Sequence, residues 1–326
     1  MSPAFSFTAV PPFPPPGEGQ GPFGEEGRGE GFDPSRPRDL WVVGDVHGAH
    51  DKLRALLMRA GLIDRAGNWT GGRAHLVFLG DYVDRGPDGV GVLRLVQQLE
   101  RQARGGGGQV TALLGNHEVM FLAAALFRSH DPQDRLGFME YWLSNGGQLW
   151  DLERLAPEDV TWIQSRPLLA RASDWLLVHA DSVFYSSLGS SLEDVNSYAA
   201  DMLRSRDPSV WGAFANAFVD RMNFVGAPGV ANARHLLERY GGQQLVHGHT
   251  PTALLCEHIL YRSDDPTVPL SYASGLCVGA DSGMAYFPDA GFIAQLGSPE
   301  WGEAQVQQVV KLPPGIFGAA SFLPVL

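Results

Sequence analysis

The sequence predicts an α/β domain in which several strands carry polar residues to one shared site. Short apolar runs recur along the chain, and each leads directly into a polar motif. The first three motifs are also evenly spaced, because 36 positions separate Asp45 from Asp81 and 35 separate Asp81 from Asn116. Short apolar runs are typical of buried strands, and α/β sheets build their sites at the carboxyl ends of such strands.

The first three strands are expected at residues 40–43, 76–79 and 110–114. A glycine follows each run and lets the chain turn sharply where the strand stops. The residues after these glycines carry the side chains that matter for chemistry. They are Asp45, His47, Asp81, Asp84, Arg85, Asn116 and His117.

Two later apolar runs, residues 176–178 and 245–246, end in histidines. The first leads into His179 and the second into His247 and His249. Carboxylates, an amide oxygen and imidazoles form a ligand set that suits paired first-row divalent metals. A single Gly-Asp pair is most simply a turn. Five such strand ends in order along the chain instead predict a two-metal phosphate-ester hydrolase.

The motif Gly-Asp-Tyr-Val-Asp-Arg-Gly at residues 80–86 resembles that of the phosphoprotein phosphatases, within the calcineurin-like metallophosphoesterases. The resemblance covers roughly residues 41–283. A finer likeness is to bacterial and Shewanella-like protein phosphatases, which share the Gly-Gly-rich approach at residues 69–72 and the Gly-His-Thr ending of the last motif. The resemblance implies a central two-sheet β-sandwich flanked by helices, with a mostly helical insertion.

The resemblance also implies two divalent metal ions. Manganese and/or iron are expected, with zinc as an alternative, because mixed oxygen and nitrogen donors do not select a metal by softness. A metal-activated water is then expected to attack phosphorus directly, without a covalent phospho-enzyme. The implied ligands are Asp45 and His47 for the first metal, Asp81 as a bridge, and Asn116, His179 and His249 for the second.

The same resemblance assigns roles around the substrate. His117 is expected to protonate the leaving oxygen, and Asp84 to fix the tautomer of His117. Arg85 is expected to bind two phosphate oxygens, since a planar guanidinium matches that geometry better than an ammonium. Asn116 would contact the substrate phosphate as well as a metal.

Three later positions complete the predicted site. A second phosphate-binding arginine is expected upstream of the last histidine; Arg221 has suitable spacing, with Arg234 and Arg204 as alternatives. His247 is expected to be a packed strand-end histidine or to support the ligands. Asp181 stands where eukaryotic family members carry glycine. One expectation is that Asp181 contacts the substrate or the residues that support the metal ligands. The other is that it is a solvated or helix-capping carboxylate.

Three functions fit these residues. The first is a phosphomonoesterase acting on phosphoprotein, at Ser/Thr or Tyr. The second is hydrolysis of a small phosphate ester such as a symmetric dinucleoside tetraphosphate. The third is an inactive phosphopeptide-binding module, which the intact ligands together with His117, Asp84 and Arg85 disfavour. The sequence leaves the physiological substrate and the oligomeric state open.

Composition limits the partners. The chain has 326 residues and a net charge of −12, which disfavours binding to the phosphate backbone of nucleic acid. No run approaches the ~18 apolar residues of a membrane span. Two cysteines, Cys256 and Cys277, provide no disulfide framework and suit a reducing compartment. The expected location is the cytoplasm, without nucleic-acid or membrane partners.

The chain is predicted to have two parts. Residues 1–37 contain nine prolines and seven glycines without an amphipathic period, so we expect a disordered leader. Residues 38–326 are expected to form the metallophosphatase catalytic domain.

Segments outside the motifs are predicted from composition and alternation. Mostly helical, tryptophan-rich insertions are expected at about residues 131–171 and 182–240, with aromatic side chains in the core or along the substrate cleft. Residues 276–278 and 285–287 are expected to form a hairpin-like pair of strands.

Overall fold

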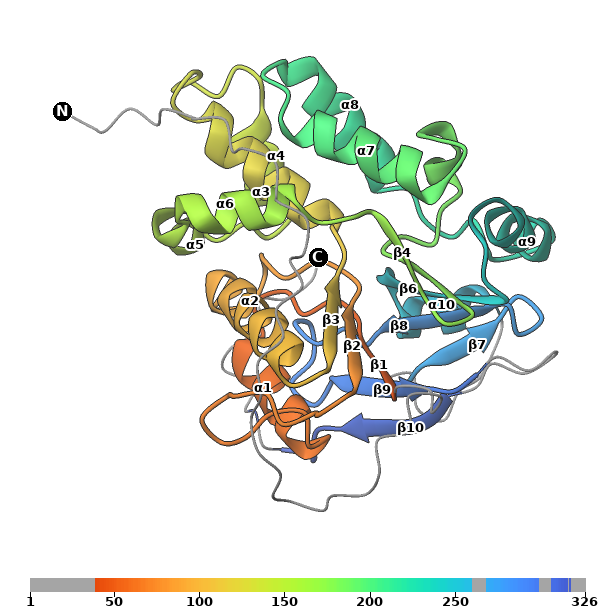
Figure 1. Cartoon of the computed structure of the whole chain (residues 1–326). Coiled ribbons are helices and arrows are strands. Elements are labelled where there is room, and N and C mark those ends of the chain that lie inside the picture. Colours follow the sequence, from red (N-terminus) through yellow and green to blue (C-terminus); the bar gives the residue numbers. More distant parts are fainter. Residues whose placement is uncertain (1–38, 260–267, 299–305, 316, 318–326) are drawn as a thin grey trace, which may run out of the picture. The chain divides into compact units, whose positions relative to one another are not determined.

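The computed structural model describes residues 39–259, 268–298, 306–315 and 317 (Figure 1). The predicted leader, residues 1–37, lies outside these ranges. The described part contains two five-stranded sheets and ten α-helices. The predicted α/β class is therefore confirmed.

The first sheet has the strand order β10-β9-β1-β2-β3. Strands β1, β2 and β3 run parallel, and β9 pairs antiparallel with β1. Helices α1 (His50–Arg59) and α2 (Gly89–Gly105) connect the parallel strands. The strand bounds are β1 Leu40–Val43, β2 His75–Phe78, β3 Gln109–Ala112, β9 Phe292–Leu296 and β10 Val306–Lys311.

The second sheet has the order β4-β5-β6-β8-β7. Its three inner strands are parallel, and each edge strand is antiparallel to its neighbour. The strand β6 is longer than the predicted run because it continues through the histidine motif. The bounds are β4 Leu169–Ala172, β5 Trp175–Val178, β6 Gln244–Pro251, β7 Leu270–Tyr272 and β8 Cys277–Asp281.

The two sheets share a buried core. Leu40 and Val42 of β1 lie in one cluster with Leu177 of β5 and Val246 of β6. The alternate residue Val43 instead belongs to the cluster that includes the buried side chains of α1 and α2. Because successive side chains of a strand point to opposite faces, β1 packs on the second sheet with one face and on the helices with the other. This is the predicted sandwich flanked by helices.

The remaining helices lie mostly in the segments predicted as insertions, and Figure 1 shows α4 to α8 gathered above the sheets. The segment 131–171 also ends in strand β4, which the helical prediction did not include. The bounds are α3 Asn116–Phe127, α4 Phe138–Ser144, α5 Leu149–Arg154, α6 Pro157–Gln164, η1 Phe184–Ser187, α7 Leu192–Leu203, α8 Pro208–Phe218, α9 Gly229–Tyr240 and α10 Thr252–His258.

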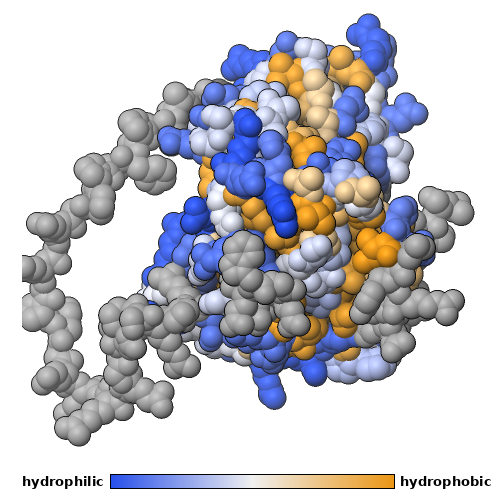
Figure 2. All heavy atoms as spheres, turned by 90° about the vertical axis from the view of Figure 1, so that its right-hand side faces the viewer, coloured by the Kyte–Doolittle hydropathy of each residue, from blue (hydrophilic) through white to orange (hydrophobic). Residues whose placement is uncertain are grey.

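The surface of the protein mixes hydrophilic and apolar side chains. Figure 2 shows hydrophilic side chains over much of one face, with apolar patches between them. Within the described ranges, every helix is too short or too polar to cross a lipid bilayer.

The predicted hairpin after the last motif is wrong. The antiparallel partner of β8 is β7, which precedes it, and residues 284–286 form a turn where the second strand was expected at 285–287. Lys52 of α1 explains the difference, because its Nζ donates hydrogen bonds to the carbonyls of Met284, Phe287 and Ala290 at 2.8, 2.6 and 3.1 Å. Carbonyls gathered around one ammonium cannot also point sideways into a strand ladder.

Candidate dinuclear metal site

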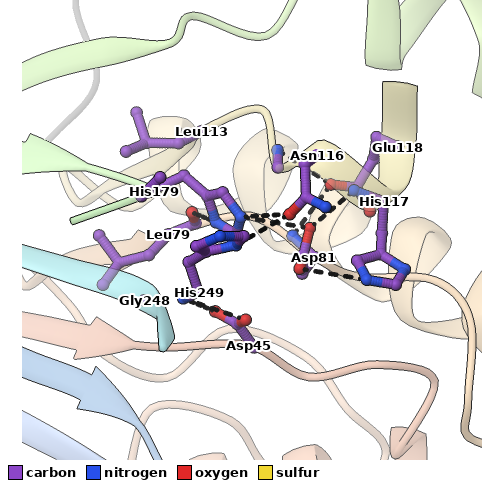
Figure 3. Close-up of polar contacts among 12 residues, drawn as sticks. Asp45, Leu79, Asp81, Leu113, Asn116, His117, Glu118, His179, Gly248 and His249 are labelled. Carbon is purple, nitrogen blue, oxygen red and sulfur yellow. Dashed lines mark hydrogen bonds and ion pairs between the residues drawn. The ribbon is translucent and has the colours of Figure 1, made fainter. Parts of the chain in front are cut away.

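Five strand ends bring the predicted ligands to one place, and Figure 3 labels all of them except His47. Asp45 and His47 follow β1, and Asp81 follows β2. Asn116 opens α3 just after β3. His179 follows β5, while His249 lies within the last part of β6. All six of these side chains are buried.

Several site residues adopt a left-handed backbone conformation although they have side chains. Such conformations cost about 1–3 kcal/mol each and persist only where the surrounding structure imposes them. The φ angles are 47° for His47, 52° for Asp81, 70° for Asp84, 65° for Arg85 and 64° for His249. The turns after the strands are therefore held in place by their neighbours.

Glu118 supplies much of that constraint. Its buried carboxylate accepts backbone hydrogen bonds from Asp81 at 2.9 Å, from Tyr82 at 2.7 Å and from Gly115 at 3.0 Å. The second and third motifs are thus tied to one side chain. The sequence analysis gave Glu118 no role. The available signal was its place three residues after Gly115, where an acidic residue often caps a helix.

The potential ligand atoms form two groups that share Asp81. One group contains His47, Asp81 and His117, the other contains Asp81, His179 and His249, and the ligand atoms of each lie within 4.8 Å of one another. Asp81 Oδ2 lies 3.6 Å from His47 Nε2, whereas Asp81 Oδ1 lies 3.5 Å from His179 Nε2. The two oxygens of Asp81 therefore face different groups, so this carboxylate could serve both, while Oδ1 also accepts the backbone N–H of His117 at 3.0 Å.

Asn116 and Asp45 join these groups from opposite sides. Asn116 Oδ1 lies 3.0 Å from both His179 Nε2 and His249 Nδ1. Asp45 Oδ2 lies 3.8 Å from His47 Nε2, and both oxygens of Asp45 accept the backbone N–H of His249. Asn116 thus belongs to the second group and Asp45 to the first, where His117 Nε2 also lies.

The histidines are oriented by hydrogen bonds at the ring nitrogen that faces away from the site. His47 Nδ1 lies 3.0 Å from the carbonyl of Val83, and His179 Nδ1 lies 2.9 Å from that of Leu79. Each Nδ1–H can donate to its carbonyl, which leaves the Nε2 lone pair directed into the site. Burial, helped by the positive charge of Arg85, lowers the pKa of His47 to about 3 and keeps the ring neutral.

The donor set fits two divalent cations. Burial raises the pKa of Asp45 well above its usual value, and the charges of Asp281 and Asp81 raise it further. Positive ions among these buried carboxylates would remove that penalty. Asp281, at the end of β8, had no predicted role. A Cβ on Gly44 would lie 2.1 Å from the Ala280 carbonyl, so only glycine admits β8 at this distance.

His117 and Asp84 form the predicted pair. His117 Nδ1 lies 2.7 Å from Asp84 Oδ2, and both side chains are buried. Asp84 Oδ1 accepts a second hydrogen bond, from Trp142 Nε1 at 2.6 Å. Trp142 belongs to α4 of the first insertion, and the sequence carried no signal that would separate it from the other tryptophans there.

Arg85 lies against the first ligand group. Its guanidinium contacts His47 Nε2, and its guanidinium carbon lies 4.9 Å from the ring centroid of Tyr286. The Arg85 backbone N–H donates to the carbonyl of Gly146 at 2.7 Å. The arginine is therefore held between the insertion and the turn after β8. Tyr286 is a further site residue that the sequence analysis missed.

Among the three candidate arginines, Arg221 lies two residues after Val219, whose carbonyl is 3.3 Å from His249 Nε2 in the second ligand group. Burial lowers the pKa of His179 and of His249, and the charge of Arg221 contributes to both shifts. Arg204 instead donates to the carbonyl of Ala200 on its own helix. These observations favour Arg221 over Arg204. Its contact with phosphate stays a prediction.

His247 and Asp181 lie behind the ligands. His247 is buried, and its Nε2 lies 2.7 Å from the hydroxyl of Tyr272. It is a packed histidine, but it lies within β6 and not at the strand end where it was predicted. Asp181 is fully buried and accepts hydrogen bonds from Thr250 and Met222, so it is not a solvated carboxylate.

Comparison with known proteins gives a family match and partial relatives. The profile of the calcineurin-like phosphoesterases matches residues 39–253. The chain is 40% identical over 85 residues to Shewanella-like protein phosphatase 2 of Arabidopsis thaliana, covering 26% of this chain and 22% of that protein. It is 33% identical over 140 residues to serine/threonine-protein phosphatase 1 of Salmonella typhimurium, covering 43% of this chain and 52% of that protein.

A different activity also appears among the relatives. The chain is 33% identical over 143 residues to the symmetrical bis(5'-nucleosyl)-tetraphosphatase of Photorhabdus laumondii, covering 43% of each chain. The matches thus span about half or less of these curated relatives. Among solved structures, the cold-active protein-tyrosine phosphatase of a psychrophilic Shewanella has a TM-score of 0.61 at 24% identity, covering 80% of this chain and 76% of that chain. This likeness supports the fold.

Proposed function

The chain belongs to the calcineurin-like phosphoesterase family, and we propose that it is a metal-dependent phosphomonoesterase that removes phosphate from phosphoprotein. The observation that carries the proposal is the division of Asp81 between two ligand groups, with Oδ2 facing His47 and Oδ1 facing His179. A carboxylate shared in this way would hold two divalent ions close together, as two-metal phosphoesterase chemistry requires.

The ligand assignment follows from the site. Asp45, His47 and Asp81 would hold the first ion, and Asp81 with Asn116, His179 and His249 would hold the second. When bound, two divalent ions supply activation of water and neutralisation of phosphoryl charge. Manganese or iron is proposed, with zinc as an alternative, because the mixed donors do not favour a soft metal.

His117 and Asp84 would handle the proton of the leaving group. Asp84 can accept the Nδ1–H of His117, which would fix the tautomer and stabilise the ring when it carries a second proton. The proton at Nε2 can then pass to the leaving oxygen. Arg85 would hold phosphate oxygens beside the first ligand group, and Arg221 would do so beside the second.

The substrate class rests on the relatives. Similarity to two protein phosphatases favours phosphoprotein, and similarity to a dinucleoside tetraphosphatase favours a second candidate, a small phosphoric anhydride. The two cysteines are both buried and free, in keeping with the proposed cytoplasmic location.

A substrate panel tests the proposal. Manganese-loaded protein is assayed on phosphoserine, phosphothreonine and phosphotyrosine peptides and on a symmetric dinucleoside tetraphosphate. We expect kcat/KM for the best peptide to exceed that for the dinucleotide at least tenfold. The reverse order would establish the second candidate.

Two controls accompany the panel. Removal of metal with a chelator should abolish phosphate release, and manganese should restore it. Asp81→Asn should lose activity, whereas Asp201→Asn, on the exposed face of α7, should retain it. Peptide binding without phosphate release in loaded protein would support the inactive binding module instead.

A further inference from the structure

The loop that carries Arg221 lies between α8 and α9 and belongs to no helix or strand. Arg221 is exposed, so packing of its own side chain does not fix it. A residue that binds a reacting phosphoryl group must nevertheless be placed accurately, because small displacements cost much of the benefit of orientation. The residues on either side of Arg221 supply that constraint.

Asp181 binds the residues that follow Arg221. Its Oδ2 accepts the backbone N–H of Met222 at 2.9 Å, and its carbonyl accepts that of Asn223 at 2.9 Å. Met222 has a φ of 66°, a conformation that a residue with a side chain rarely adopts. Asn223 Nδ2 donates in turn to the carbonyl of Arg221 at 3.1 Å. The contacts with Asp181 thus hold a turn that the loop would not keep alone.

The residues after Asp181 hold the loop from its other side. The Ser182 hydroxyl donates to the carboxylate of Asp220, which precedes Arg221. The backbone N–H of Val183 donates to Asn223 Oδ1 at 2.9 Å. The chain after β5 therefore binds the loop both before and after Arg221.

Asp181 also joins this loop to the metal ligands. Its Oδ1 accepts the hydroxyl of Thr250 at 2.6 Å, and Thr250 directly follows His249. Asp181 itself lies two residues after His179. The buried carboxylate of Asp181 thus connects three segments of the chain. Each carries a predicted site residue close to the contact: His179, Arg221 and His249.

We propose that Asp181 is a positioning residue that holds the loop 220–223 so that Arg221 faces a phosphoryl group beside His179 and His249. The inference rests on the proposed function in taking the ligand as a phosphoryl group. Asp181 touches no reacting atom and acts through Arg221.

Phosphate binding provides a test that does not depend on turnover. Inorganic phosphate is titrated into manganese-loaded protein by calorimetry, and bound manganese is measured by mass spectrometry. The variants are Arg221→Ala, Asp181→Ala and the double variant. Asp201→Ala, exposed on α7, is the matched control.

Each single variant should weaken phosphate binding about tenfold, as expected for loss of a charge-assisted contact. The double variant should bind no more than twofold more weakly than Arg221→Ala, because removal of Arg221 leaves Asp181 nothing to position. Bound manganese should stay unchanged. Thr250→Val, which removes only the link toward His249, should change phosphate affinity less than twofold.

Two further variants cover the case in which Asp181→Ala does not fold. Asp181→Asn keeps an acceptor oxygen for Met222 and should bind phosphate within threefold of wild type. Ser182→Ala weakens the other side of the loop and should reduce phosphate affinity while manganese is retained.

Independent losses that multiply in the double variant would overturn the proposal. Loss of bound manganese from Asp181→Ala with phosphate affinity preserved would also overturn it. Asp181 would then support the metal ligands and not the loop that carries Arg221. Protein that binds phosphate but hydrolyses neither peptide nor dinucleotide would refute the proposed function alone. Wild type that binds no phosphate would refute both.

Discussion

Trp142 donates its indole N–H to Asp84 Oδ1 at 2.6 Å, while Asp84 Oδ2 accepts from His117. An insertion outside the core sheets thus supports the residue that orients the predicted general acid. Trp142 is fully buried, so the hydrogen bond is shielded from water. The insertion therefore contributes directly to the geometry of the site.

Trp142→Phe should lower kcat several-fold and reduce stability by about 1–3 kcal/mol, because Asp84 is left with an unpaired buried oxygen. Thermal unfolding measures the stability, and steady-state kinetics on an alkyl phosphate, whose leaving group needs a proton, measure kcat. Trp150→Phe is the matched control: Trp150 is 48% exposed and also donates a hydrogen bond, to Pro87 O. Equal effects of the two substitutions would contradict a special role for Trp142.

His117→Asn should keep both metals and lower kcat by ~10²–10⁴-fold, the range for removal of a general acid. The loss should be small for p-nitrophenyl phosphate, whose leaving group hardly needs a proton, and large for alkyl phosphates. A Brønsted plot across leaving groups measures the difference. If both classes lost activity equally, His117 would have another function.

Tyr286→Leu should raise KM for peptides and small aryl phosphates alike, by about threefold to tenfold, because Arg85 loses the ring that supports it. Tyr286→Phe keeps the ring and should stay within twofold of wild type. Steady-state kinetics on a phosphopeptide and on a small aryl phosphate measure the change in KM. An unchanged KM in the leucine variant would show that Arg85 is fixed by Gly146 and His47 instead.

Trp150→Leu should change the ranking of phosphotyrosine and phosphoserine peptides but leave p-nitrophenyl phosphate little affected. The half-exposed ring lies beside Pro87, two residues beyond Arg85, where it can contact parts of a substrate beyond the phosphate. Competition between paired peptides measures the ranking. An unaltered preference between the two peptides would show that Trp150 does not determine substrate specificity.

Lys52→Met should lower stability at pH 7 by at least about 2 kcal/mol, because three carbonyls lose a shared donor. Burial also lowers the pKa of Lys52 to about 8. The unfolded chain, with a lysine pKa of about 10.4, then binds more protons between pH 8 and 10, so this residue makes the free energy of unfolding rise with pH there. Urea unfolding across this range should show a flatter profile for Lys52→Met than for the exposed control Arg59→Met on the same helix.

The sequence predicted the strands, and the strand ends at which the candidate ligands lie together, because both signals are local. An apolar run ending in Gly-Asp or in histidine can be recognised within a few residues, and the parallel arrangement then brings Asp45, Asp81 and Asn116 together. Trp142 and Asp181 could not be assigned in this way. Asp181 contacts Met222 and Thr250, which lie 41 and 69 positions away, and no local pattern encodes such contacts.

The segment 284–290 shows a different limit. The alternation of side chains at residues 285–287 is compatible with a strand, but the single ammonium of Lys52, 232 positions from Met284, attracts three carbonyls of the longer segment. Tertiary contacts of this kind override a weak local pattern.

The hydrogen bonds between Asp45 and His249 have a consequence for biosynthesis. The two residues are 204 positions apart, so at about 5–20 residues per second a ribosome needs roughly 10–40 s to make the second after the first. During that interval the nascent chain presents Asp45, His47 and Asp81 without the strand that completes the ligand set. If the proposed ligands hold the metals, stable loading would follow synthesis of β6, and a chain arrested before His249 would be left with an incomplete set of ligands.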